Sequence, residues 1–132
     1  MPEFYDRFLV PAMFEPFARD IAQRLHGIQS GHVLEVAAGT GIVTRALART
    51  LPAAVAITAT DLNPAMLAQA RSHAGTERVQ WQEADALSLP FAEQQFDYIV
   101  CQFGVMFFPD KVAAFCEALR VLRPGGHFLF SV

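Results

Sequence analysis

A nearly apolar segment that runs into a glycine turn constrains the fold of this chain more than any other feature. Residues 33–37 read V-L-E-V-A, which indicates a buried strand, and Gly39 and Gly41 follow within one short turn. Apolar residues then recur at helical spacing from Ile42 onward. The order of strand, glycine turn and helix is typical of the first unit of a nucleotide-binding α/β fold.

A carboxylate in the middle of that strand limits the kind of ligand. Burial of Glu35 costs several kcal/mol unless the side chain is paired or hydrogen-bonded, so we expect it to have a partner. A pyrophosphate is a poor partner because two anions within a few ångströms repel each other. The sequence therefore favours a cationic or amine-bearing nucleoside.

Length and charge narrow the class of protein. The 132 residues allow one domain with a sizeable core, and the hydrophobic fraction of 53% suits parallel strands covered on both faces. The net charge is -3 and the ten lysine and arginine residues are scattered, which argues against a nucleic-acid partner. No apolar run approaches the roughly 18 residues of a membrane span, so we expect no membrane partner.

The cysteines and histidines lack the spacing of a metal or redox site. Cys101 falls in an expected strand and Cys116 on an expected helix, and we expect both to be buried thiols in a reducing cytosol. The four histidines, at positions 26, 32, 73 and 127, do not have the spacing of metal ligands. We therefore predict no metal site and a cytoplasmic location.

Strands and helices are expected to alternate along the chain. The predicted strands are residues 32–37, 55–60, 79–83, 96–103 and 127–132. The predicted helices begin near Pro16, Ile42, Pro64 and Lys111, and Asn63 and Asp110 are the expected N-caps of the last two. This alternation predicts an α/β fold, a Rossmann-like doubly wound parallel sheet of about five strands with right-handed crossovers.

Two further expectations concern the first and last helices. Residues 1–31 are expected to form an N-terminal helical cap on a core of residues 32–132. A lid over the ligand, with Tyr5, Phe8 and Phe14 as wall residues, is the alternative for this segment. The last helix is expected to pack on the sheet through one apolar face, made of Val112, Phe115, Cys116, Leu119 and Leu122.

Polar residues stand where the expected strands end, and ligands of open α/β sheets bind outside these carboxyl ends. Asp61 can accept both hydroxyls of a ribose, and Asp85 with the amide of Ala86 can contact an adenine edge. Each feature also has a purely structural explanation: glycine turns pack tightly, Asp61 can start an Asx turn, and Asp85 can be a loop carboxylate. Acidic residues at three strand ends beside a glycine turn together favour a nucleoside site.

Five motifs connect the chain to a known family. They occur in the order V-L-E-V-A-A-G-T-G, T-D-L-N-P-A-M-L, E-A-D-A-L-S-L-P-F, F-D-Y-I-V-C-Q-F-G and V-L-R-P-G-G, between residues 33 and 126. In these motifs the chain resembles the class I S-adenosylmethionine-dependent methyltransferases, most of all the ubiquinone/menaquinone-type C-methyltransferases and related small-molecule enzymes. The likeness extends over residues 33–132.

The resemblance implies S-adenosylmethionine as the cofactor. It implies that Glu35 holds the methionine amino group through water, that Asp61 binds the ribose hydroxyls and that Gln102 offers its carbonyl near the sulfonium. It also implies adenine contacts with Leu62, Asp85 and Ala86. The full set of implied cofactor-binding residues is Glu35, Ala37, Ala38, Gly39, Thr40, Gly41, Asp61, Leu62, Asp85, Ala86, Gln102 and Phe103.

The chain departs from the family pattern in three places. Ala37 stands where many relatives have glycine, and Met106-Phe107 replaces a polar pair of the quinone methylases, which argues against a quinone acceptor. The family sheet normally ends with an antiparallel strand pair after the fifth strand, whereas this sequence stops at Val132. We expect either a C-terminal truncation of a longer protein or self-association through the open sheet edge.

The expected reaction is methyl transfer to a small, partly hydrophobic acceptor, because residues 102–108 give a mostly apolar wall. No side chain is identified as a catalytic base. One alternative is an NAD-dependent oxidoreductase, which shares the glycine turn and Asp61 but prefers a third glycine where Thr44 stands. The other is a cofactor-binding module without turnover, because the final strands are missing.

Overall fold

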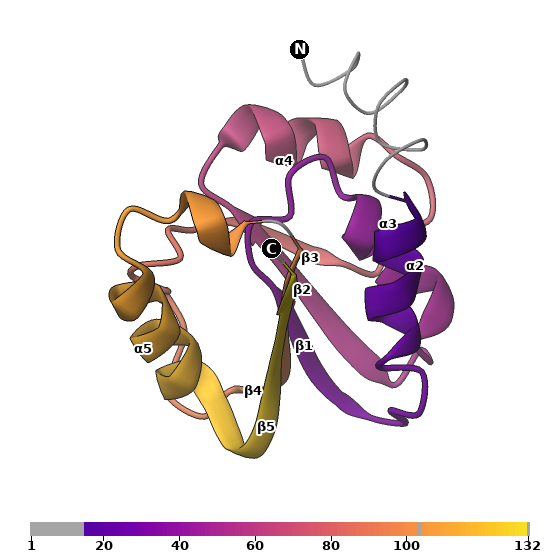
Figure 1. Cartoon of the computed structure of the whole chain (residues 1–132). Helices are drawn as coiled ribbons and strands as arrows, with labels where there is room; N and C mark the ends of the chain where they lie inside the picture. Colours follow the sequence, from indigo (N-terminus) through magenta and orange to yellow (C-terminus); the bar gives the residue numbers. More distant parts are fainter. Residues whose placement is uncertain (1–14, 103, 132) are drawn as a thin grey trace.

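A computed structural model describes residues 15–102 and 104–131 of the chain. Five parallel strands form one sheet in the order β3-β2-β1-β4-β5 (Figure 1). The strands are β1 (Gly31–Glu35), β2 (Val55–Asp61), β3 (Gln80–Glu83), β4 (Phe96–Gln102) and β5 (Leu122–Ser131). The helices are α2 (Glu15–Gln23), α3 (Ile42–Thr50), α4 (Pro64–Arg71) and α5 (Lys111–Val121), with a 3₁₀ turn η2 (Val105–Phe107). The predicted α/β fold class is confirmed.

The strand order places the predicted site residues along one edge of the sheet. The order reverses beside β1, which lies between β2 and β4. Glu35 at the end of β1 is in register with Ala59 of β2 and Val100 of β4. Asp61 is likewise in register with Glu83 at the end of β3. The carboxyl ends of these four strands therefore meet at the point where α/β folds bind ligands.

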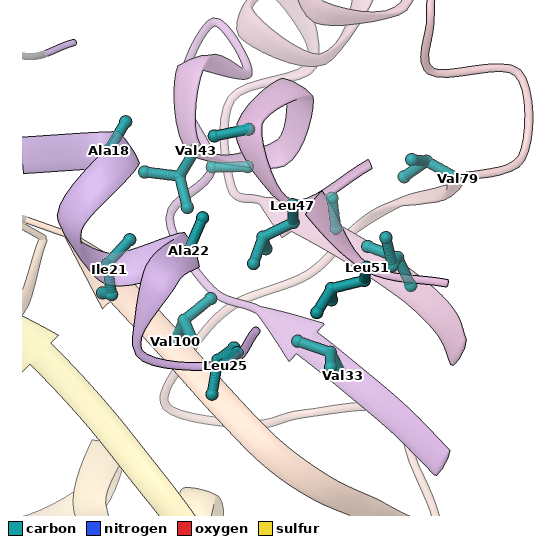
Figure 2. Packing of buried hydrophobic residues seen from close by; sticks show 14 of the residues in the cluster. Ala18, Ile21, Ala22, Leu25, Val33, Val43, Leu47, Leu51, Val79 and Val100 are labelled. Carbon is teal, nitrogen blue, oxygen red and sulfur yellow. The ribbon is translucent and has the colours of Figure 1, made fainter. Parts of the chain in front are cut away.

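Two apolar clusters cover the two faces of the sheet. On one face, α2 and α3 pack against β1 and β2 (Figure 2), and Leu47 and Val33 are fully buried there. On the other face, α5 and η2 pack against β1 and β4 around Phe96 and Ile99. Helices on both faces explain why the strands carry almost continuous apolar runs. Among the described residues, no helix has the length and apolarity needed to cross a membrane.

Two helix starts follow from local sequence alone. The Asn63 side chain accepts a hydrogen bond from the amide of Ala65 at 2.9 Å, and Pro64 occupies the first turn of α4. The Asp110 side chain accepts a hydrogen bond from the amide of Ala113 at 3.0 Å. Both predicted N-caps are therefore confirmed.

The predicted apolar face of the last helix is correct only at Phe115, whose ring packs against Phe128 and Phe130, and at Leu122, which packs against the core cluster around Phe96. Val112 and Leu119 are 73% and 75% exposed, and Cys116 is also exposed instead of buried. The buried face consists of Ala114, Ala118 and Val121. Because α5 leads into β5 without a loop, Val121 must enter the core, and this sets the rotation of the helix. The two alanines lie on the same face and let the helix pack close to the sheet.

The last strand begins five residues earlier than predicted, at Leu122 instead of His127. Leu122 is in register with Phe96, and His127 is in register with Tyr98, so the pairing shifts between them. Residues 123–126 (R-P-G-G) lie between these two paired positions and form an irregularity in the strand. A Cβ atom at Gly126 would lie 2.8 Å from the Asp97 carbonyl oxygen, so only glycine fits this course of the backbone.

The first helix contributes to the core. α2 buries Ala18, Ile21 and Ala22 against α3 and the sheet (Figure 2). The alternative role of a lid rested on Tyr5, Phe8 and Phe14, and these positions lie outside the described residues.

Candidate functional site

Three residues with positive φ shape the segment between β1 and α3. They are Ala37 (57°), Gly39 (58°) and Gly41 (88°). The amide of Ala38 donates to the Thr60 carbonyl at 2.9 Å, which holds the turn against β2. Left-handed conformations favour glycine, so the two glycines are needed for the backbone course itself.

Glu35 is buried under this turn. It is 1% exposed, and the Thr44 hydroxyl of α3 donates a hydrogen bond to its carboxylate. The pKa of Glu35 is raised to about 8, mainly by burial and to a smaller extent by the nearby charge of Asp61. The Thr44 hydrogen bond and Arg45 act in the opposite direction. Glu35 is nevertheless one of the residues that line a cavity at this end of the sheet.

Asp61 links the glycine turn to the start of α4. One carboxylate oxygen accepts a hydrogen bond from the Gly39 amide at 2.8 Å, and the other accepts from the Asn63 amide at 2.9 Å. The Asx-type turn that the sequence allowed is thus present. The side chain also lines a cavity, so the structural and ligand-binding interpretations of Asp61 are compatible.

Asp85 begins the link between β3 and β4. Its side chain accepts a hydrogen bond from the Leu87 amide at 2.9 Å, and its carbonyl accepts from the Ser88 amide at 2.9 Å. This tight turn places Asp85 and Ala86 in the same cavity wall as Leu62. Leu62 is 62% exposed, which is unusual for a large apolar side chain at a strand end.

Two cavities lie side by side at the carboxyl ends of the strands. The first, about 350 Å³, is lined by Glu35, Ala37, Ala38, Gly39, Thr40, Ile42, Val43, Met66, Gln102, Gly104, Phe107 and Phe108. The second, about 190 Å³, is lined by Val36, Ala37, Asp61, Leu62, Ala84, Asp85, Ala86, Leu87, Phe107, Phe108 and Pro109. Ala37, Phe107 and Phe108 belong to both linings, so the cavities meet at these residues.

Ten of the twelve predicted site residues line these two cavities. Gly41 lines neither: a Cβ atom there would lie 3.0 Å from the Cβ of Ala70 and 3.3 Å from the Trp81 ring, so this glycine lets α4 and β3 approach the turn. Phe103 lies outside the described residues.

The sequence placed Phe107 and Phe108 in an apolar wall for the acceptor, but not among the cofactor-binding residues. Their position depends on Gly104, where a Cβ atom would lie 2.7 Å from the Ala37 Cβ and 2.8 Å from the Cys101 sulfur. Glycine at this position allows η2 to pack directly against Ala37. Phe107 of η2 and Phe108, the residue after it, then line both cavities. The F-G step after β4 was the signal for this close approach.

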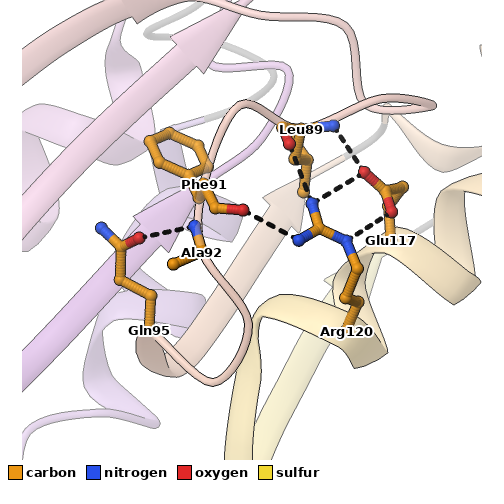
Figure 3. A network of polar contacts seen from close by, with 6 residues as sticks. All are labelled: Leu89, Phe91, Ala92, Gln95, Glu117 and Arg120. Atoms are coloured by element: carbon orange, nitrogen blue, oxygen red, sulfur yellow. Dashed lines mark hydrogen bonds and ion pairs between the residues drawn. The ribbon is translucent and has the colours of Figure 1, made fainter.

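A polar network holds the link that carries Asp85 (Figure 3). Arg120 of α5 donates to the carbonyl oxygens of Phe91 at 2.8 Å and Leu89 at 2.9 Å. Glu117 accepts from the Leu89 amide at 2.7 Å and pairs with Arg120 at 2.8 Å. The hydrogen bond from Arg120 lowers the pKa of Glu117. These contacts with α5 therefore hold the segment between β3 and β4 in place, although that segment contains no helix.

Comparison with known proteins identifies the family. Residues 34–130 match a family described as a methyltransferase domain. The chain belongs to this family. It is 43% identical over 103 residues to an uncharacterised protein of Mycobacterium tuberculosis, covering 76% of this chain and 36% of that protein.

Two further relatives carry functional names. The chain is 33% identical over 128 residues to the ubiquinone/menaquinone biosynthesis C-methyltransferase of Geobacter sulfurreducens, covering 94% of this chain and 50% of that enzyme. It superimposes with a TM-score of 0.80 and 27% identity on a proposed S-adenosyl-L-methionine-dependent methyltransferase of Methanococcus maripaludis. That match covers 98% of this chain and 59% of the other. The chain thus spans 36% of the Mycobacterium tuberculosis protein and 50% of the Geobacter sulfurreducens enzyme.

Proposed function

We propose that this chain binds S-adenosylmethionine across the two cavities and takes part in transfer of its methyl group to a small, partly hydrophobic acceptor. The single observation that carries the proposal is the pairing of a buried carboxylate, Glu35, with a second carboxylate, Asp61, in adjoining cavities of one site. Membership of the methyltransferase-domain family supports the same cofactor.

The first cavity suits the amino-acid half of the cofactor. An ammonium group beside Glu35 favours the ionised carboxylate and offsets the cost of burying it. The glycine turn at residues 38–40, just before α3, also lines this cavity.

The second cavity suits the adenosine half. Both oxygens of Asp61 already accept one backbone amide, and each retains a lone pair for a ribose hydroxyl. Leu62 and Ala86 provide apolar surface for a purine ring, and Asp85 provides an acceptor for its amino group.

The proposed chemistry depends on position more than on a catalytic base. The bound sulfonium supplies an activated methyl group and a neutral leaving group, so methyl transfer is an in-line displacement. The chain has to align the acceptor with the methyl carbon and exclude water. The apolar wall at Phe107 and Phe108 favours an acceptor with apolar surface.

Calorimetric titration with S-adenosylhomocysteine and with NAD tests the proposal. We expect S-adenosylhomocysteine to bind and NAD not to bind, because a pyrophosphate gives Glu35 no cationic partner and opposes its ionisation. Glu35→Gln and Asp61→Ala should each weaken the binding of S-adenosylhomocysteine. Binding of NAD alone would overturn the proposal in favour of an oxidoreductase.

A further inference from the structure

One aromatic side chain at the junction between the two cavities does not pack in the hydrophobic core. Phe107 is 78% exposed and belongs to neither apolar core cluster, although it lines both cavities. Phe108 lines both cavities too, but it packs against the core cluster around Phe96. Phe107 is therefore the ring at the junction that remains available to a ligand.

The chemistry of the cofactor determines which atom reaches this junction. This step rests on the proposed function, with the amino group at Glu35 in the first cavity and the ribose at Asp61 in the second. The sulfonium sulfur joins these two halves covalently, so it must lie where the cavities meet. The residues shared by both linings are Ala37, Phe107 and Phe108, and none of them carries a charge.

We propose that the ring of Phe107 packs against the sulfonium and gives the site a preference for the charged cofactor over its neutral product. The face of an aromatic ring attracts a cation within about 6 Å of its centre. S-adenosylhomocysteine carries a neutral thioether at the same position and loses this attraction, while its contacts with Glu35 and Asp61 are unchanged. Phe107 thereby favours release of the product after transfer.

The backbone around Phe107 is suited to this role. η2 is a single turn held against Ala37 by the close approach at Gly104, so the ring projects from a fixed turn at the junction. The amide of Phe107 donates to the Gly104 carbonyl at 3.0 Å, which closes that turn. The exposed ring gains apolar burial as well as cation contact when a ligand binds.

Calorimetric titration of the 132-residue chain with S-adenosylmethionine and with S-adenosylhomocysteine tests the inference. We expect Phe107→Leu to weaken S-adenosylmethionine binding about 2- to 30-fold, the range of a cation–π contact, and to weaken S-adenosylhomocysteine binding much less. Phe107→Trp should increase the preference, since indole binds cations best. Phe115→Leu, which alters an aromatic side chain of α5 outside both cavities, should leave both affinities unchanged.

The outcomes separate this inference from the proposed function. If the unaltered chain binds neither ligand, the proposed function fails and the inference fails with it. If the unaltered chain binds both, but Phe107→Leu weakens them equally or not at all, the inference alone is overturned. A melting temperature measured for each variant shows that it is folded, and Phe107→Trp supplies the same comparison should the leucine variant be unstable.

Discussion

The Thr44 hydroxyl donates a hydrogen bond to the Glu35 carboxylate, and these side chains are 0% and 1% exposed. α3 thus contributes a buried donor to a carboxylate of β1 directly below the glycine turn. A single hydroxyl donor does not compensate an ionised carboxylate, and burial raises the pKa of Glu35 to about 8. The ionisation of Glu35 is therefore coupled to whatever occupies the first cavity.

Cofactor affinity should rise with pH. Without ligand, Glu35 is mostly protonated at pH 7 because its pKa is about 8. A ligand ammonium favours the ionised form, so binding releases a proton, and affinity should increase between about pH 6 and 8 and then level off. Calorimetric titration of S-adenosylhomocysteine over this range measures the slope, and titrations in buffers with different ionisation enthalpies count the proton. Glu35→Gln should abolish the slope, and an unaltered slope in that variant would contradict the assignment.

Folding stability should depend on pH in the opposite direction. The ordinary pKa of 4.5 for a glutamate applies in the unfolded chain, and the folded value is about 8. Between these values the folded state holds more protons than the unfolded state, so the contribution of Glu35 to stability falls as the pH rises through this window. Glu35→Gln cannot ionise, and its stability relative to the unaltered chain should be greater at pH 8 than at pH 5. Urea denaturation at these two pH values measures the difference; equal differences would exclude a buried, proton-linked Glu35.

Asp61→Ala should weaken cofactor binding by about 1–3 kcal/mol, the cost of losing hydrogen bonds to a charged acceptor. The loss has two sources, because Asp61 also accepts the amide hydrogen bond that fixes Gly39. Asn63→Ala is the matched control, since it removes the N-cap of α4 and Asn63 lines neither cavity. Titration with S-adenosylhomocysteine should detect the loss for Asp61→Ala alone. Unchanged affinity in Asp61→Ala would remove this residue from the site.

The features that the sequence predicted correctly are those set by local chemistry. Asn63 and Asp110 cap helices because each side chain reaches an amide two or three residues ahead, which needs no tertiary contact. The predicted face of α5 failed because the helix rotation depends on Val121, which enters the core where α5 meets β5. Helical periodicity selected the larger apolar residues, of which Phe115 does pack on β5, but the buried residues of the helix are Ala114, Ala118 and Val121.

Only part of the candidate site was predicted from the sequence, because some of its residues are placed by tertiary contacts. Strand ends can be identified from sequence, so Glu35, Asp61 and Asp85 were found together. The contribution of Phe107 depends on the contact between Gly104 and Ala37, two residues far apart in sequence. The F-G step after β4 draws attention to Gly104, but periodicity and spacing do not identify Ala37 as its partner.

The network at Arg120 leads to the last prediction. Arg120→Gln removes hydrogen bonds to the Leu89 and Phe91 carbonyls and releases the link that begins with Asp85. Arg78→Gln is a matched control, because Arg78 also donates to backbone carbonyls, those of Leu51, Pro52 and Val55.

The bonds of Arg78 lie at the start of β2, the opposite end of the sheet from both cavities. We expect both variants to lower the melting temperature, because each releases a loop from its arginine anchor. Only Arg120→Gln should also weaken S-adenosylhomocysteine binding, since it frees the wall formed by Asp85 and Ala86. Thermal unfolding and calorimetric titration of the two variants side by side make the test. Equal affinity of the two variants for S-adenosylhomocysteine would mean that Asp85 and Ala86 keep their positions without the Arg120 hydrogen bonds. The turn closed by the hydrogen bond from the Ser88 amide to the Asp85 carbonyl would then be sufficient.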